Sequence, residues 1–280
     1  MIFVRLARRA EGDTAAMLRC RSIELRASVF GLACLCACSA LAAEPPDSIQ
    51  RVKASIVAIG TFQQSRSPAF GFRGTGFAVG DGLMIATNAH VVPTMLDSER
   101  REVLVVAIPG APGASPQLRA AKTLAVDQDH DLALLRVEGP ALPALALGDS
   151  SRVREGQTLL PTGFPLGGVL GLIPATHRAM VAALTPIAIP SGNASQLDAR
   201  AIKQLSKSPY PVMQLDGTAY PGNSGSPLYD PLSGEVLGIV NMVFVKGSRE
   251  TALTQPSGIS YAVPAQPLKV LLQSVGEPQR

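Results

Sequence analysis

The segment from Gln214 to Tyr229 decides how the rest of the chain is interpreted, and it reads Gln-Leu-Asp-Gly-Thr-Ala-Tyr-Pro-Gly-Asn-Ser-Gly-Ser-Pro-Leu-Tyr. At its centre Ser224 lies in a glycine-rich turn bracketed by Pro221 and Pro227, between two apolar segments. Glycine tolerates backbone angles that other residues avoid and proline fixes its own, so the sequence predicts a tight, rigid loop. A serine hydroxyl becomes a nucleophile only when a base takes its proton and a group stabilises the oxyanion. The N–H groups of the turn can meet the second requirement, and the chain has only three histidines for the first.

A histidine and an aspartate each adjoin an apolar run elsewhere in the chain. One run leads to His90, and Asp131 opens another, Leu-Ala-Leu-Leu. The order His, Asp, Ser is that of the chymotrypsin-type triad, whereas α/β-hydrolases run Ser, acid, His. The α/β-hydrolase elbow Gly-x-Ser-x-Gly also fails here, because position 226 is a serine. Gly-Asn-Ser-Gly alone would indicate a surface turn, but the three segments together favour a catalytic triad.

These segments resemble the trypsin-like serine peptidases, specifically the HtrA (Deg) branch, over about Ser55 to Gln273. The matching motifs are Thr87-Asn88-Ala89-His90-Val91-Val92, Asp131-Leu132-Ala133-Leu134-Leu135 and Gly222-Asn223-Ser224-Gly225. The resemblance implies that Ser224 is the nucleophile, that His90 accepts its proton and returns it to the leaving amine, and that Asp131 orients the imidazole. It also implies an oxyanion hole at Gly222, Asn223 and Ser224, with the N–H groups of Gly222 and Ser224 as donors.

The resemblance places the substrate cleft at Thr218, Ala219, Tyr220 and Asn241. Thr218 lies six positions before Ser224, where trypsin has its pocket aspartate. Without a carboxylate there, we expect cleavage after small or medium aliphatic side chains, the habit of the family, rather than after Lys or Arg. Tyr220 replaces an asparagine that is common in the family, and Asn241 lies where the substrate-pairing strand begins.

The other two histidines have weaker claims to a role in the chemistry. His130 precedes Asp131, and consecutive strand residues point to opposite faces, so one of the two should face away from the site. His177 lies in a strand-like segment without a Ser/Asp constellation nearby. We expect both to be structural or exposed.

Composition excludes several classes of function. Of the 280 residues, 46% are hydrophobic and 16% charged, which suits a buried core and excludes a largely disordered chain. Most of the net charge of +4 lies in residues 1–43, so nothing calls for nucleic acid or an anionic surface as a partner. All four cysteines also lie there, and no His-x-x-x-His pair follows. We therefore expect no metal and no cofactor. The mixed charge run of Asp97 to Glu102 indicates a solvated surface.

Short apolar runs separated by Gly, Pro, Asp and Ser predict an all-β protein. The family resemblance implies two closed antiparallel Greek-key β-barrels, which leave no bare strand edges. We place them at 44–150 and 151–280, with His90 and Asp131 on the first and Ser224 on the second. Leucines at 268, 271 and 272 and a valine at 275 predict a short C-terminal helix. The expected strands are 55–62, 74–79, 83–87, 103–108, 118–125, 132–137, 157–162, 177–184, 211–215, 235–245 and 258–263.

Residues 1–43 have the features of a signal peptide. A run of 17 uncharged residues, 27–43, follows several arginines and ends in Ala40-Leu41-Ala42, a small-x-small cleavage signal. The run is short for a membrane span, although an uncleaved anchor stays an alternative. Met1 and Met17 are both candidates for the first residue, since Met17 precedes Arg19 and Arg21. A loose lipobox would make Cys38 a lipidated residue, but we favour soluble export to the periplasm or medium.

The family usually carries peptide-binding PDZ modules after the peptidase barrels, whereas this chain stops 16 residues after the expected closing strand, which ends at Pro264. We therefore expect an exported endopeptidase without a PDZ domain, acting on unfolded or damaged envelope polypeptides, in a family whose members are often trimers. The alternative is a peptidase-like binding scaffold with a latent triad. The expected lack of a PDZ module, together with the substitutions at Tyr220 and Ser226, motivates it.

Overall fold

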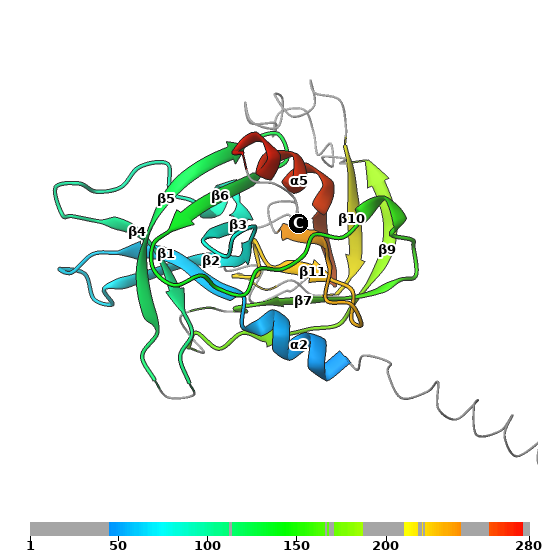
Figure 1. The fold of residues 1–280 in the computed structure, drawn as a ribbon, viewed down its shortest axis with the longest axis horizontal. Coiled ribbons are helices and arrows are strands. Elements are labelled where there is room, and N and C mark those ends of the chain that lie inside the picture. Colours follow the sequence, from blue (N-terminus) through cyan, green and yellow to red (C-terminus); the bar gives the residue numbers. More distant parts are fainter. Residues whose placement is uncertain are drawn as a thin grey trace, which may run out of the picture. The chain divides into compact units, whose positions relative to one another are not determined.

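A computed structural model describes residues 45–111, 114–165, 167, 171–186, 210–217, 220, 222–241 and 258–276. The expected leader and the expected substrate residues Thr218 and Ala219 lie outside them. The described part forms two antiparallel β-barrels followed by a C-terminal helix, so the predicted fold class is confirmed (Figure 1).

The first barrel is closed, with the strand order β1-β2-β3-β6-β5-β4. The hairpin between its second and third strands turns at Gly80 and Gly82, both at positive φ, and a Cβ on Gly82 would lie 2.2 Å from the Leu142 carbonyl oxygen. Glycine is therefore required where the chain turns toward His90. The strands are β1 (Ile56–Phe62), β2 (Phe70–Val79), β3 (Met84–Asn88), β4 (Val103–Ile108), β5 (Gln117–Asp127) and β6 (Leu132–Val137).

The second barrel repeats this order. Its sheet runs β11-β12-β13-β10-β9-β7, an additional pairing of β11 with β7 closes it, and the short β8 extends β7. In both barrels the fourth strand lies beside the first, which is the Greek-key arrangement. The strands are β7 (Thr158–Gly163), β8 (Ala175–Thr176), β9 (Ala179–Pro186), β10 (Pro211–Asp216), β11 (Pro227–Tyr229), β12 (Val236–Asn241) and β13 (Ile259–Pro264).

One of three buried hydrophobic clusters among the described residues spans both barrels and forms a shared core. Phe77 and Leu134 of the first barrel belong to the same buried cluster as Phe164 and Tyr229 of the second. Since all four side chains are fully buried, the packing ties the barrels together across the seam where the candidate site lies.

Two helices complete this core. α5 (Ala265–Ser274) buries Leu268 and Leu272 and contacts strands of both barrels, as the 3.6-residue periodicity predicted. α2 (Pro45–Lys53) was not expected from the sequence, because only Ile49 and Val52 mark its apolar face. A hydrogen bond from the Ser48 hydroxyl to the Pro231 carbonyl fastens α2 to the second barrel.

Candidate active site

His90 and Asp131 come from two connections of the first barrel. His90 lies in the 3₁₀ turn η1 (Ala89–Val91), which directly follows β3. Asp131 ends the turn that precedes β6, and its φ of 54° puts it in the left-handed region. Non-glycine residues adopt this conformation rarely, and such strain is maintained by surrounding contacts, often at functional sites.

Four hydrogen bonds hold the two segments together. The Asp131 carbonyl accepts from the Ala89 N–H at 3.0 Å and from Asn88 Nδ2 at 3.1 Å. Its carboxylate accepts from the His90 N–H at 2.9 Å and lies 2.6 Å from His90 Nδ1. The His90 and Asp131 side chains are only 26% and 20% exposed, so water screens the pair incompletely. A carboxylate at Nδ1 fixes the tautomer that leaves Nε2 free to accept a proton.

Asn241, at the end of β12, adds a further donor to this carboxylate. Its Nδ2 lies 2.9 Å from Asp131 Oδ2, and the residue is fully buried. The side chain that we expected beside the substrate is therefore in contact with Asp131, the expected triad acid. The second barrel thus participates directly in the His–Asp pair of the first.

Ser224 lies in a buried turn between β10 and β11, and is 6% exposed. The Gly225 N–H donates to the Val240 carbonyl at 3.0 Å, and the Val240 N–H donates to the Ser226 carbonyl at 2.9 Å. We call residues 222–226 the nucleophile turn, after the role expected of Ser224. Since Val240 is the neighbour of Asn241, this turn and the side chain that contacts Asp131 are attached to the same strand, β12.

The nucleophile turn also contacts the segment that carries His90. A Cβ on Gly74 would lie 2.7 Å from Val91 Cγ2 and 3.0 Å from the Ser224 carbonyl oxygen, so both groups pack on this one glycine. Hydrogen bonds join His90 to Asp131 and Asp131 to Asn241, whereas none joins the Ser224 hydroxyl to the imidazole among the described residues. Such bonds are often long before substrate binds.

The three residues expected to form the oxyanion hole differ in whether their backbone N–H already donates a hydrogen bond within the protein. The Asn223 N–H donates to the Tyr220 carbonyl at 3.0 Å and is therefore occupied within the turn. Gly222 has a φ of 106°, and a Cβ there would lie 2.3 Å from the Phe164 carbonyl oxygen. Only glycine fits this position. The N–H groups of Gly222 and Ser224 stay the donors we assign to an oxyanion.

A small cavity lies beside the turn, and its walls include Asn223, His177, Leu215, Val240 and Ser260. Burial lowers the pKa of His177, so the neutral imidazole is favoured. His177 Nε2 and Asn223 Oδ1 are buried without a partner among the described residues. His177, which we expected to be structural or exposed, therefore lies across this cavity from Asn223 in the turn that carries Ser224.

His130 makes a separate pair of its own. Its Nδ1 lies 2.6 Å from Asp127 Oδ2, and its ring packs on Tyr210 with a centroid separation of 4.6 Å. The segment before β6 is a turn rather than a strand, so alternation of faces does not separate His130 from Asp131. The two residues are instead distinguished by their partners, because His130 contacts Asp127 and Asp131 contacts His90.

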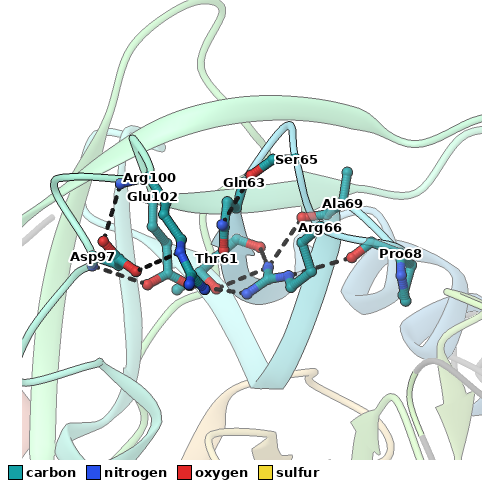
Figure 2. A network of polar contacts seen from close by, with 9 residues as sticks. All are labelled: Thr61, Gln63, Ser65, Arg66, Pro68, Ala69, Asp97, Arg100 and Glu102. Carbon is teal, nitrogen blue, oxygen red and sulfur yellow. Dashed lines mark hydrogen bonds and ion pairs between the residues drawn. The ribbon is translucent and has the colours of Figure 1, made fainter.

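A polar network supports the loop that continues from His90 (Figure 2). Arg66 donates to the Thr61 carbonyl at 2.7 Å and to the Ala69 carbonyl at 3.0 Å, and it pairs with Glu102 at 2.9 Å. Hydrogen bonds from the Thr61 hydroxyl and the Asp97 N–H lower the pKa of Glu102. The expected solvated surface is therefore only partly correct, since the Glu102 side chain is 16% exposed.

Within the described ranges, no group of three or more His, Cys, Asp or Glu side chains is placed to hold a metal ion. In the same residues no helix is both long and apolar enough to span a membrane.

Two curated relatives illustrate the similarity to known proteins. A "Probable periplasmic serine endoprotease DegP-like" of Marinomonas sp. (strain MWYL1) is 29% identical over 217 residues, which are 73% of this chain and 36% of the relative. "Serine protease HTRA2, mitochondrial" of Drosophila pseudoobscura pseudoobscura is 32% identical over 217 residues, 76% of this chain and 41% of the relative. The chain therefore spans well under half the length of these relatives.

Solved structures agree with the fold. The "HtrA-type protease AlgWS227A with tripeptide" superposes with a TM-score of 0.57 at 22% identity, covering 83% of this chain and 63% of that one. The "Rv3671c protease from M. tuberculosis, active form" gives a TM-score of 0.57 at 21% identity, covering 83% of this chain and 85% of that one.

The family described as "Trypsin-like peptidase domain" matches residues 74–239, which contain all three proposed triad residues. Because this match covers more than half of the chain, and because the curated relatives are of the DegP and HTRA2 type, the chain belongs to the trypsin-like peptidases and has HtrA-type homologues.

Proposed function

We propose that the chain is an exported serine endopeptidase that cleaves peptide bonds through Ser224, His90 and Asp131. The observation that carries the proposal is the contact of Asp131 Oδ2 with both His90 Nδ1, at 2.6 Å, and Asn241 Nδ2, at 2.9 Å. This carboxylate is held by both barrels, and it faces the imidazole nitrogen that must stay protonated during catalysis.

The residues have distinct roles in the proposed reaction. Ser224 Oγ attacks the substrate carbonyl carbon while His90 Nε2 takes the hydroxyl proton, and the same proton then passes to the amine as the C–N bond breaks. Water repeats the sequence on the acyl-enzyme and releases the acid. The N–H groups of Gly222 and Ser224 stabilise the oxyanion, each contributing about 2.7–4 kcal/mol.

Polypeptides of the bacterial envelope are the proposed substrates. The amino-terminal residues 1–43 supply the proposed export signal, and the DegP-like relatives are named as periplasmic. Thr218 replaces the carboxylate that would favour Lys or Arg, so we propose small or aliphatic side chains before the scissile bond. Thr218, Ala219 and Tyr220 would border that side chain. Unfolded polypeptides would present such small or aliphatic side chains most readily, because these side chains are buried in folded proteins.

Ser224→Ala tests the proposal against casein hydrolysis and fluorophosphonate labelling of the purified protein. We expect hydrolysis to fall on the order of 10⁶-fold and labelling to disappear, because only an activated serine reacts. Ser226→Ala is the matched control, since this serine is two residues away and fully buried. It should retain both activities. Hydrolysis that persists in Ser224→Ala would refute the proposal.

A second candidate is a binding scaffold with a latent triad. It is favoured by the lack of a hydrogen bond between the Ser224 hydroxyl and the described residues around it. Wild-type protein that binds casein but neither hydrolyses it nor reacts with the fluorophosphonate would establish this candidate instead.

A further inference from the structure

Thr75 of β2 joins the first barrel to the nucleophile turn by two hydrogen bonds. It is fully buried, and its backbone N–H donates to the Ser224 carbonyl at 2.9 Å. Its hydroxyl donates to the Gly222 carbonyl at 2.7 Å and accepts from the Phe164 N–H at 3.1 Å. One residue therefore binds the carbonyls on both sides of Asn223.

The direction of the Thr75 hydroxyl is determined by its neighbours. A threonine hydroxyl has one proton to donate, and here the Phe164 N–H occupies an acceptor site on the oxygen. The Thr75 carbonyl accepts in turn from the Thr87 hydroxyl at 2.7 Å, which anchors the peptide group that follows Thr75. The single hydroxyl proton is thus aimed at the Gly222 carbonyl by a rigid surrounding.

The turn fits against Thr75 without spare room. Gly225 has a φ of 85°, and a Cβ there would lie 2.1 Å from the Thr75 carbonyl oxygen. The Ser224 N–H, an assigned oxyanion donor, belongs to the backbone between the two carbonyls that Thr75 holds. Fixing the carbonyls of Gly222 and Ser224 therefore restricts rotation of the peptide groups that must point at the oxyanion.

We infer that Thr75 is a positioning residue: its hydroxyl sets the conformation of the Gly222–Gly225 turn, so that the oxyanion donors are aligned before substrate arrives. This inference rests on the proposed function, because an oxyanion forms only if Ser224 attacks a carbonyl. Thr75 does not touch the reacting atoms, and it acts through the backbone of Gly222 and Ser224. The first barrel thereby controls a turn that belongs to the second.

Removing the hydroxyl should misalign the turn rather than merely loosen the protein. In Thr75→Val the side chain keeps nearly the same shape, but the Gly222 carbonyl and the Phe164 N–H lose their buried partner. Unpaired buried backbone groups are costly, so the turn should shift to satisfy them elsewhere. Such a shift moves the oxyanion donors, and its effect falls on the transition state rather than on substrate binding.

The test compares Thr75→Ser, Thr75→Cys and Thr75→Val, in order of decreasing donor strength. Hydrogen exchange of the amides of Asn223, Gly225 and Ser226 reports on the turn without requiring catalysis, because all three are hydrogen-bonded within it or to β12. We expect exchange to increase about tenfold or more in the valine variant and to stay near the wild-type rate in the serine variant.

The kinetic measurement follows the same series with a peptide substrate. The valine variant should lose about tenfold to a hundredfold in kcat with little change in KM, and the serine variant should restore most of it. Thr162→Val is the matched control, because the fully buried Thr162 hydroxyl also has two hydrogen-bond partners, Tyr229 and Thr176, at 2.8 Å each. It should leave kcat and the turn amides unchanged.

Several outcomes would overturn the inference. Unchanged exchange of the turn in Thr75→Val would do so, as would an equal loss in Thr162→Val, which would indicate general destabilisation. If the valine variant does not fold, the cysteine variant must show intermediate exchange and kcat for the inference to stand. A wild-type protein without any hydrolysis or labelling would refute the proposed function instead, and the exchange series would still report on the role of Thr75.

Discussion

Asn241→Ala is expected to lower kcat by roughly tenfold to a hundredfold while changing KM little. The substitution removes one of three hydrogen bonds that described residues donate to the Asp131 carboxylate, the other two coming from the His90 backbone and ring. Asn241 is fully buried, so the lost donor cannot simply be replaced by bulk water.

The magnitude follows from the charge on the acceptor. A hydrogen bond to a charged group contributes about 1.5–3 kcal/mol, and about 1.36 kcal/mol corresponds to a factor of ten in rate. In the proposed mechanism the Asp131 carboxylate must be oriented most accurately when the His90 imidazolium forms, which happens only as Ser224 attacks. A carboxylate that tilts away stabilises this cation less, and kcat therefore falls more than substrate affinity.

Asn88→Ala supplies the matched comparison for this prediction. Asn88 is also a fully buried asparagine, but its Nδ2 donates to the Asp131 carbonyl, a neutral group, at 3.1 Å. A neutral hydrogen bond contributes about 0.5–1.5 kcal/mol, so we expect a smaller loss of kcat, of about fivefold. Peptide hydrolysis gives kcat and KM, and urea denaturation gives the free energy of unfolding of each variant. Equal losses of kcat in the two variants, or a kcat within twofold of wild type in Asn241→Ala, would show that the carboxylate contact is not what matters.

Two further predictions concern the turn and the charged network. Gly222→Ala should abolish fluorophosphonate labelling, because its Cβ would lie 2.3 Å from the Phe164 carbonyl oxygen at a φ of 106°. Gly156→Ala is the control: its φ is 83° and nothing lies within 4 Å of the added Cβ, so it should lower stability but keep labelling. The Thr61 hydroxyl lowers the folded-state pKa of Glu102 below 4.5, so Glu102 should stabilise the protein above pH 4.5 and lose this contribution as the pH falls through the lowered value. Denaturation of wild type and Glu102→Gln across pH 3–7 measures this, and a stability difference that grows as the pH falls would contradict it.

The short apolar runs and the turn-forming residues between them were sufficient to predict most of the strands. Runs such as 103–108 and 132–137 coincide with β4 and β6, because buried apolar strands bounded by Gly, Pro and Asp have few alternative structures. β11 was not predicted, since three residues after Pro227 are too few to show any period. The expected strand at 177–184 corresponds to β9, which begins and ends two residues later, and the two-residue β8 before it was not predicted.

The sequence predicted the motifs of the candidate site, but it did not predict the side-chain contacts between them. The triad motifs predicted His90, Asp131 and Ser224 because their residue types and order are specific. Thr75 gave no such signal, since its role depends on a hydroxyl meeting the carbonyl of a residue 147 positions away. Asn241 was assigned to the cleft, yet its contact with Asp131 depends on how the ends of two barrels meet.

The repeated strand order explains why the residues of the proposed site come from corresponding connections of the two barrels. His90 follows the third strand of the first barrel, β3, and Ser224 follows the third strand of the second, β10. Asp131 lies in the connection after the fifth strand of the first barrel, and Asn241 ends the fifth strand of the second. The hydrogen bond between Asp131 and Asn241 joins equivalent ends of the two barrels, and the contacts of Gly74 with Val91 and Ser224 join the other pair of ends. A site built from these connections requires the same ends of both barrels to face each other, so a shift of one barrel against the other would disturb the proposed base, acid and nucleophile together.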